Sequence, residues 1–211
     1  MIDVGANIGN ICIPLVKQKL FERAICFEPD PANFKLLTVN TILNDLDDSM
    51  MLANMALGSE PEQELEFELS PENFGDHRVR VSKQLGIEKE ESRPVIKVNS
   101  TTLDAFLAEN EQGSLEGVLI WVDVQGYEGL VLKGAKNTLT KGLPLVLEFW
   151  PYGLKRAGTF EFLLEALHSY PFFIDLGREM PLKHDLKELE ILYSNHSSDA
   201  FFMIDILVLS V

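Results

Sequence analysis

The opening stretch MIDVGANIGN has residues of the right types and spacing to hold a polar ligand. Asp3 precedes a turn that contains Gly5, Asn7 and Gly9. Glycines let the backbone pass close to a ligand and turn sharply into a helix, whose free N–H groups bind polar or anionic atoms. A strand–helix turn without a ligand is the alternative for such a motif taken alone. The middle position is Asn7, whereas a dinucleotide fingerprint has a glycine there.

Glu28, in CFEPD, ends the second apolar run of the chain. It lies about 20 residues beyond the opening turn, where an acidic residue accepts hydrogen bonds from both hydroxyls of an adenosine ribose. A solvated glutamate at a strand end would be the simpler interpretation of Glu28 alone. Combined with the opening turn, Glu28 favours a nucleotide-containing cofactor.

Two further carboxylates end apolar runs in the middle of the chain. Asp123 follows VLIWV in the block WVDVQGYEGLVLKGA, and Glu148 lies in LVLEFWP beside Trp150. A charge next to such an apolar run needs compensation unless it lies at the open end of a sheet. Asp123 is therefore predicted to face the same crevice as the opening turn. Glu128 stands in the first turn of a helix, where the helix dipole favours an acid, so capping explains it.

Short β-rich apolar runs alternate with longer amphipathic ones, which predicts parallel strands connected by helices. Strands are expected at 1–4, 23–29, 50–59, 63–69, 94–99, 117–126, 143–151, 171–177 and 200–211. Helices are expected at 10–21, 30–43, 100–110, 127–142 and 159–170, and a helix or irregular stretch at 182–192. Asp30 and Pro31 form a helix start signal, and Phe34, Leu37 and Ile42 suggest its inward face. The resulting fold class is α/β, a doubly wound sheet that binds its ligand at the carboxyl ends of the strands.

The chain of 211 residues is predicted to form a single domain, 1–211, with a polar loop or lid insertion around 70–93. The net charge of −15 disfavours a nucleic-acid substrate, because phosphate binding needs clustered Lys and Arg. No apolar run approaches the roughly 20 residues that span a bilayer, and no signal sequence starts the chain. Cys12 and Cys26 are interpreted as small core residues, which fits a reducing, cytoplasmic location.

Six blocks taken in order resemble the FkbM-type methyltransferase family. They are DVGANIG, CFEPDPANFKLLTVN, NMALGS, VNSTTLDAFL, WVDVQGYEGLVLKGA and LVLEFWP. The resemblance covers approximately residues 2 to 150. It implies a Rossmann-like class I fold with a mostly parallel sheet, helices on both faces and an antiparallel C-terminal strand. It also implies S-adenosylmethionine as cofactor and a hydroxyl oxygen of a small molecule, sugar or lipid as methyl acceptor.

The resemblance also implies roles for individual residues. It places the methionine part of the cofactor against Asp3, Gly5, Asn7 and Gly9. It places the ribose on Glu28 and the adenine near Asn54 and Ala56, and Asp123 borders the same site. A weaker match, NFGDHRV, brings Asn73, Asp76, His77 or Arg78 over the cofactor.

Two positions depart from the family pattern. Gln125 stands where the D-x-E-G-x-E block commonly has an acid, and glutamine supplies no charge, so no metal site is predicted. Only Met1 and Ile2 precede Asp3, whereas family members usually have several more strand residues. The first strand is therefore expected to be short at its N-terminal end, as if truncated, but central in the sheet.

Transfer of a methyl group to an alcohol needs alignment of the acceptor oxygen and removal of its proton. The candidate bases are His77, Asp123 and Glu148. His77 has a suitable ordinary pKa of roughly 6.5, although a histidine in a polar loop is commonly just solvated. Two alternatives stay open: a nicotinamide-dependent dehydrogenase, disfavoured by Asn7 and the acidic middle block, and a noncatalytic cofactor-binding protein. The sequence does not indicate an oligomeric state.

Overall fold

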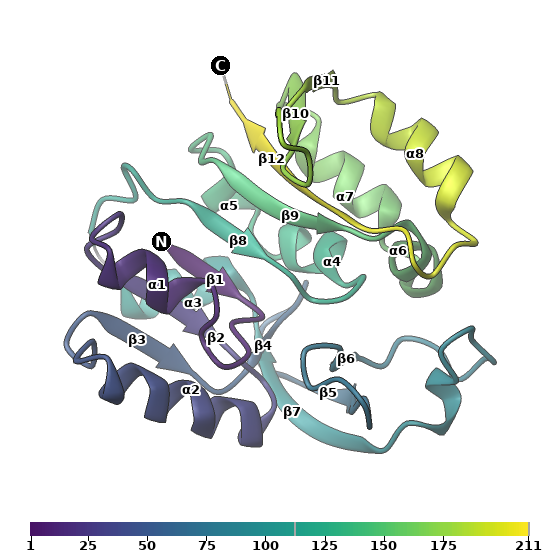
Figure 1. Cartoon of the computed structure of the whole chain (residues 1–211). Coiled ribbons are helices and arrows are strands. Elements are labelled where there is room, and N and C mark those ends of the chain that lie inside the picture. The colour runs from purple at the N-terminus through teal and green to yellow at the C-terminus, as the bar shows by residue number, and fades with distance from the viewer. Residues whose placement is uncertain (112, 211) are drawn as a thin grey trace.

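The computed structural model describes residues 1–111 and 113–210. Its centre is an eight-stranded sheet with the strand order β11-β10-β12-β9-β8-β1-β2-β3 (Figure 1). From β9 to β3 neighbouring strands are parallel, whereas β12, β10 and β11 pair antiparallel. The strands are β1 Ile2–Val4, β2 Ala24–Phe27, β3 Met50–Ala53, β8 Ile120–Val122, β9 Leu145–Phe149, β10 Phe172–Asp175, β11 Lys183–Asp185 and β12 Ile204–Leu209.

This arrangement confirms the α/β class and corrects part of the predicted sheet. A mostly parallel sheet with one antiparallel strand at its C-terminal end was expected, whereas the last three strands all pair antiparallel, which makes the sheet mixed. β1 is three residues long and lies between β2 and β8, as the short run before the opening turn predicts.

Helices pack on both faces of the sheet around β1 and β2. One apolar cluster joins α1 and α2 to Ala24, Cys26 and Met50. A larger cluster on the other face includes buried side chains of the remaining α-helices. The helices are α1 Cys12–Lys17, α2 Pro31–Leu43, α3 Leu103–Asn110, α4 Glu128–Lys133, α5 Lys136–Leu139, α6 Pro151–Ala157, α7 Phe160–Leu167 and α8 Glu188–His196. No helix among the described residues is long and apolar enough to cross a membrane.

A second, four-stranded sheet lies beside the first in the order β4-β7-β5-β6 (Figure 1). Its strands are β4 Ala56–Leu57, β5 Gln63–Glu68, β6 Arg78–Val79 and β7 Val95–Thr101, and a short 3₁₀ helix, η1, spans Glu90–Ser92. The run 50–59, expected as one strand, is divided between the two sheets: β3 belongs to the first and β4 to the second. The chain therefore passes from one sheet to the other at Asn54 and Met55.

Local start signals are confirmed where they were expected. Asp30 caps α2 by accepting a hydrogen bond from the Asn33 backbone N–H at 2.9 Å. Leu37 is fully buried on the inward face of α2, but Ile42 is 56% exposed, so its predicted burial is wrong. The helix expected at 127–142 is two helices, α4 and α5. They are separated near Gly134, where a side-chain Cβ would lie 2.0 Å from the Gly58 carbonyl oxygen.

Candidate functional site

The opening turn and the end of β8 meet at the carboxyl edge of the parallel strands. Gly5 directly follows β1 and has a φ of +88°. A Cβ at Gly5 would lie 1.9 Å from the backbone carbonyl oxygen of Asp123. The Asp123 N–H in turn donates to the Val4 carbonyl at 3.0 Å. Only glycine fits such a position, so the sequence of the turn brings these two segments into direct contact.

A cavity opens at this edge, between the two sheets. Gly5, Asn7 and Glu28 line it from the first two strand ends, and Asp123 lines it from the third. Ala56 from β4 and His77, just before β6, complete the predicted residues in its wall. The remaining lining residues are mostly apolar: Val4, Phe27, Pro29, Asn33, Met55, Leu57, Phe67, Phe74, Gly75, Val79, Val124 and Tyr127. Six of the predicted site residues therefore share one cavity.

Glu28 connects the opening turn to the turn after β2. Its carboxylate accepts from the Asn7 N–H at 2.9 Å and from the Asp30 N–H at 2.8 Å, one on each oxygen. Each oxygen retains a lone pair that can accept a hydroxyl of a ligand. Burial raises the pKa of Glu28 to about 7, and the two backbone hydrogen bonds oppose that rise. A bound diol would add donors that favour the carboxylate form.

Asn7 has a left-handed backbone, with φ +50°. Its side-chain Oδ1 is buried and has no hydrogen-bond partner among the residues that the structure describes. A buried acceptor without a donor is costly, because it has lost its water without replacement. Asn7 also lines the cavity, so a ligand that carries a hydrogen-bond donor would satisfy this oxygen if it reached it there.

Three other predicted cofactor residues lie outside the cavity lining. Asp3 is 1% exposed and packs against Cys12 and Cys26, with its side-chain oxygen and the two sulfurs within 4.8 Å of one another. Burial raises the pKa of Asp3 to about 6. Gly9 packs against Ile13, because a Cβ there would lie 2.4 Å from its Cδ1. Both cysteines are free and buried, as core residues are.

Asn54, the third of these residues, is exposed and supports the wall from outside. Its amide donates to the Glu28 carbonyl at 2.8 Å and to the Pro29 carbonyl at 3.1 Å. Asn54 therefore holds the turn after β2 beside the crossing from β3 to β4. The neighbouring Met55 and Ala56 are the residues of this crossing that reach the cavity.

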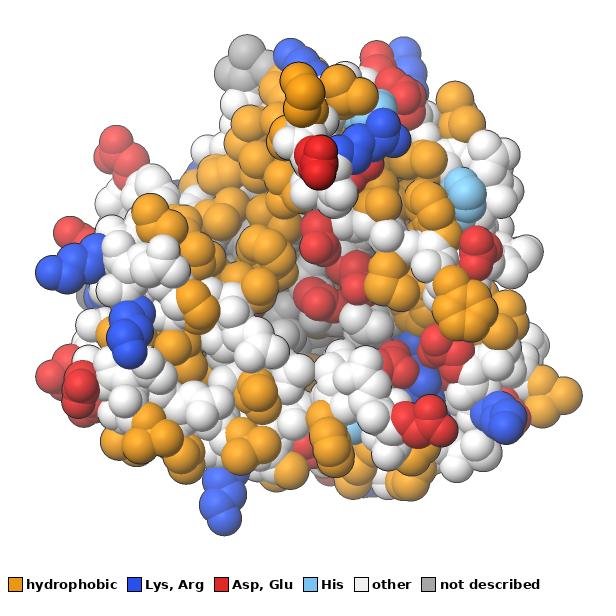
Figure 2. Space-filling view, in the orientation of Figure 1, with side chains coloured by type: hydrophobic (Ala, Val, Ile, Leu, Met, Phe, Trp, Pro, Cys, Tyr) orange, Lys and Arg blue, Asp and Glu red, His pale blue; other side chains and the backbone are white. Residues whose placement is uncertain are grey.

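Asp123 and Glu148 lie side by side because β8 and β9 are parallel neighbours. Val122 is in register with Leu147, which places the next residue of each strand at the same level. One amide nitrogen connects them: Gln125 Nε2 donates to Asp123 Oδ1 and to Glu148 Oε2, both at 2.8 Å. Burial raises the pKa of Asp123, and burial next to Asp123 raises that of Glu148 well above its usual range. Figure 2 shows acidic side chains gathered in a hollow near the middle of this face.

His77 faces the cavity with one ring nitrogen already engaged. Its Nδ1 accepts the Ser70 backbone N–H at 3.0 Å, so in the neutral ring the proton resides on Nε2. Burial lowers the pKa of His77. A neutral imidazole with Nδ1 occupied presents a donor to the cavity, which suits orientation of a ligand better than removal of its proton.

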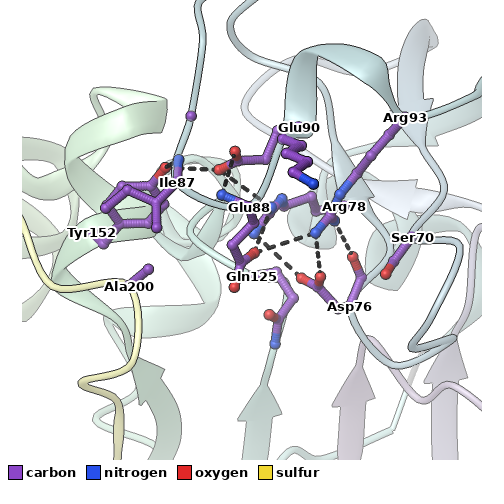
Figure 3. Close-up of polar contacts among 12 residues, drawn as sticks. Ser70, Asp76, Arg78, Ile87, Glu88, Glu90, Arg93, Gln125, Tyr152 and Ala200 are labelled. Carbon is purple, nitrogen blue, oxygen red and sulfur yellow. Dashed lines mark hydrogen bonds and ion pairs between the residues drawn. The ribbon is translucent and has the colours of Figure 1, made fainter.

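The segment expected as a polar insertion, 70–93, contributes β6 and η1 and a network of ion pairs. Arg78, 5% exposed, pairs with Glu68 at 2.9 Å and Glu88 at 3.1 Å. Arg93 pairs with Asp76 at 2.5 Å. Figure 3 shows Arg78 and Arg93 beside Asp76 and Glu88, with Gln125 beneath them in this view. Asp76 and Arg78 thus serve this network, and neither lines the cavity.

Several lining residues were not expected from the sequence. Phe67 and Val79 come from the second sheet. The period of two in QELEFEL predicted a strand but carried no information about its partners. Gln125 was noted only as a missing acid, although its positive φ of +56° and its contacts place it between two carboxylates.

Two comparisons found proteins that are similar to this chain. Residues 3–174 match the family model described as the methyltransferase FkbM domain. Among solved structures, the methyltransferase FkbM from Methylobacillus flagellatus KT is similar at 16% identity and a TM-score of 0.55, over 99% of this chain and 42% of that chain. TYW2 from P. horikoshii, crystallised in complex with MeSAdo, is 15% identical with a TM-score of 0.43, over 100% of this chain and 56% of that chain.

The chain thus spans about half the length of each of these two structural relatives. A search of curated proteins found no match. The family model covers most of the chain, including the opening turn, Glu28 and the pair formed by Asp123 and Glu148. The chain therefore belongs to the FkbM methyltransferase family.

Proposed function

We propose that this protein transfers a methyl group from S-adenosylmethionine to a hydroxyl oxygen of a small molecule, sugar or lipid. The observation that carries the proposal is the shared cavity, in which Gly5, Asn7 and Glu28 lie next to Asp123. S-adenosylmethionine supplies the methyl group on a positively charged sulfur, which is an excellent leaving group. The residues of the chain must bind the cofactor, orient the acceptor and take its proton.

The residues fit each part of the cofactor. The buried, unpartnered Oδ1 of Asn7 accepts from the ammonium group of the methionine part. Glu28 accepts the ribose hydroxyls on oxygens that its two backbone donors already hold in place. The apolar wall that Met55, Ala56 and Phe74 help to form suits the adenine ring. Asp3 does not line the cavity, so it supports the opening turn from the core and does not contact the cofactor.

Asp123 is the group in the cavity that takes the acceptor proton. It is half-buried, it lines the cavity, and its carboxylate is a hydrogen-bond acceptor at the end of β8. His77 Nε2–H, on another part of the wall, donates to an oxygen of the acceptor or cofactor. Tyr127 adds an aromatic face against which a sugar ring or an apolar chain can pack.

Binding of S-adenosylhomocysteine, measured by isothermal titration calorimetry, tests the cofactor. The wild-type protein should bind it, and Glu28→Gln should bind at least about tenfold more weakly, because loss of hydrogen bonds to a charged acceptor costs about 1.5–3 kcal/mol. Glu109→Gln, an exposed glutamate on α3, is the matched control and should bind as the wild type does. Binding of NADH without binding of S-adenosylhomocysteine would instead support a dehydrogenase and exclude the proposal.

Methyl transfer itself is tested with methyl-tritiated cofactor. The purified protein is incubated with separate pools of sugars, hydroxylated lipids and hydroxylated small molecules, and the label in each pool is counted. Label should enter one pool with the wild type and be reduced at least about 100-fold with Asp123→Asn, as removal of a general base predicts. Cofactor binding without label in any pool would favour a noncatalytic cofactor-binding protein.

A further inference from the structure

Gln125 has no role in the binding of the cofactor or the acceptor as proposed above. It follows Asp123 by two residues, in a left-handed conformation that directs its amide back over the strand ends. Its Nε2 donates two hydrogen bonds to carboxylates, one to Asp123 Oδ1 and one to Glu148 Oε2, each at 2.8 Å. An amide nitrogen has two hydrogens, so this group is fully used in joining the pair.

Most of the charged groups around the pair are acids, and the cations Arg78 and Arg156 line the same cavity as Gln125. Asp205 on β12 is in register with Glu148, Glu128 begins α4, and Asp76 lies before β6. Two carboxylates that lie side by side and face further acids resist ionising together, because their like charges repel. Gln125 Nε2 lies within hydrogen-bond distance of an oxygen of each carboxylate, which places the two groups close enough to interact.

The pair also lies where two cavities approach each other. Asp123 lines the proposed cofactor cavity, whereas Gln125 lines a neighbouring cavity with Trp150 and Arg78. Tyr127 and Val79 line both. Glu148 lines neither cavity, so a hydroxyl group of the acceptor would meet the pair through Asp123, beside the proposed methyl donor.

We infer that Asp123 and Glu148 work as one proton-accepting unit, with Gln125 as the positioning residue that holds the two carboxylates together. This inference rests on the proposed function and deepens it. In the step it describes, the acceptor O–H bond breaks, its electron pair stays on oxygen for the new bond to the methyl carbon, and the proton passes to Asp123. The bond between the methyl carbon and the cofactor sulfur would break at the same time, and its electron pair would stay on the sulfur. Glu148 shares that proton, so the unit changes from one bound proton to two.

The unit is tested by carbon-13 NMR titration of the carboxyl groups, assigned with Asp123→Asn and Glu148→Gln. In the wild type the two carbons should titrate together, in two steps separated by more than one pH unit, because interacting sites share their macroscopic pKa values. Gln125→Met keeps the length of the side chain and loses both N–H donors that stabilise the ionised pair. It should therefore raise the pKa of the first step by about one pH unit. Gln84→Met, at an exposed glutamine, should change neither step. Independent single steps in the wild type, or no effect of Gln125→Met, would overturn the inference.

A second measurement tests whether the unit faces the reacting methyl group. The titration is repeated with bound S-adenosylhomocysteine and with bound sinefungin, in which an ammonium group replaces the methyl-bearing sulfonium. A positive charge beside the unit favours its ionised form. The pKa of the first step should therefore be about one pH unit lower in the sinefungin complex than in the S-adenosylhomocysteine complex. Equal titrations in the two complexes would place the unit away from the reacting centre and overturn its role. Failure of both ligands to bind would refute the proposed function, and with it any part of the unit in methyl transfer, whatever its titration.

Discussion

Gly5 is the residue on which the geometry of the site depends most directly. Its missing side chain allows the opening turn to touch the backbone of Asp123, and its positive φ is one that other residues adopt only with strain. The same contact brings Asn7 and Asp123 to one cavity. At this scale, a ligand site is made by the absence of a methyl group as much as by the polar atoms around it.

Replacement of Gly5 by alanine should therefore cost far more than the strain of its backbone. Gly158→Ala is the matched control, because Gly158 also has a positive φ, +66°, but a Cβ there meets no atom within 4 Å. The control should lose about 1–2 kcal/mol of unfolding free energy in urea, the cost of a left-handed alanine. Gly5→Ala should lose at least about 2 kcal/mol more and should not bind S-adenosylhomocysteine. Equal losses in the two variants would contradict the contact with Asp123.

The second sheet is the element that completes the cavity. It begins with β4, which follows β3 of the main sheet and pairs with β7. The side chains of Phe67, His77 and Val79, in or next to this sheet, line the cavity. The network centred on Arg78 holds β5, β6 and η1 together. The pairs of Arg78 with Glu68 and Glu90 are buried, so removal of one partner leaves the other charge without compensation.

Arg78→Met should thus destabilise the protein by about 3–5 kcal/mol, the usual cost of breaking a buried ion pair from one side. Lys97→Met is the control: it breaks an ion pair with Glu64 in the same sheet, but both side chains are more than half exposed. Such exposed pairs contribute about 0–1 kcal/mol. Urea unfolding measures both values, and amide hydrogen exchange should show faster exchange in β5 and β7 for Arg78→Met. Similar losses for the two variants would contradict the role of burial.

The whole molecule carries a large negative charge and also buries several carboxyl groups around the site. Burial raises the pKa values of Glu28 and Glu128 to about 7 and that of Asp3 to about 6. Each group binds its proton more tightly in the folded state than in the unfolded chain. The stability that these groups contribute is therefore present below their unfolded pKa values and is lost as pH rises through their folded ones.

The free energy of unfolding should accordingly fall as pH rises from about 4.5 to about 7. Glu128 is fully buried, with one oxygen that accepts two backbone N–H groups and one that has no partner. Its share of the fall is about 3 kcal/mol, since its pKa is raised from 4.5 to about 7. Glu128→Gln should remove that share and flatten the profile, measured by urea unfolding at pH 5, 6, 7 and 8. Glu109→Gln should keep the wild-type slope; an unchanged slope for Glu128→Gln would contradict the assignment.

Local signals in the sequence were enough to predict most elements and part of the site. The Asp30–Pro31 start signal, the strand ends at Glu28 and Asp123, and the position of β1 between two neighbours all agree with the structure. These features depend on nearby residues and on the rule that parallel strands end at one edge of a sheet. The adjacency of Asp123 and Glu148 follows from the same rule.

Other features were decided only when distant segments packed together. Asp3 was expected to touch the cofactor, but the register of β1 turns its side chain toward Cys12 and Cys26, away from the cavity. The division of 50–59 between two sheets and the place of β6 in the wall depend on strand pairing across long stretches of chain. Gln125 acquired its position from a left-handed turn and from a strand 20 residues later. The sequence by itself determined which residues end the strands, and the tertiary structure decided which of them face one another, because pairing and register are set by the burial of whole faces.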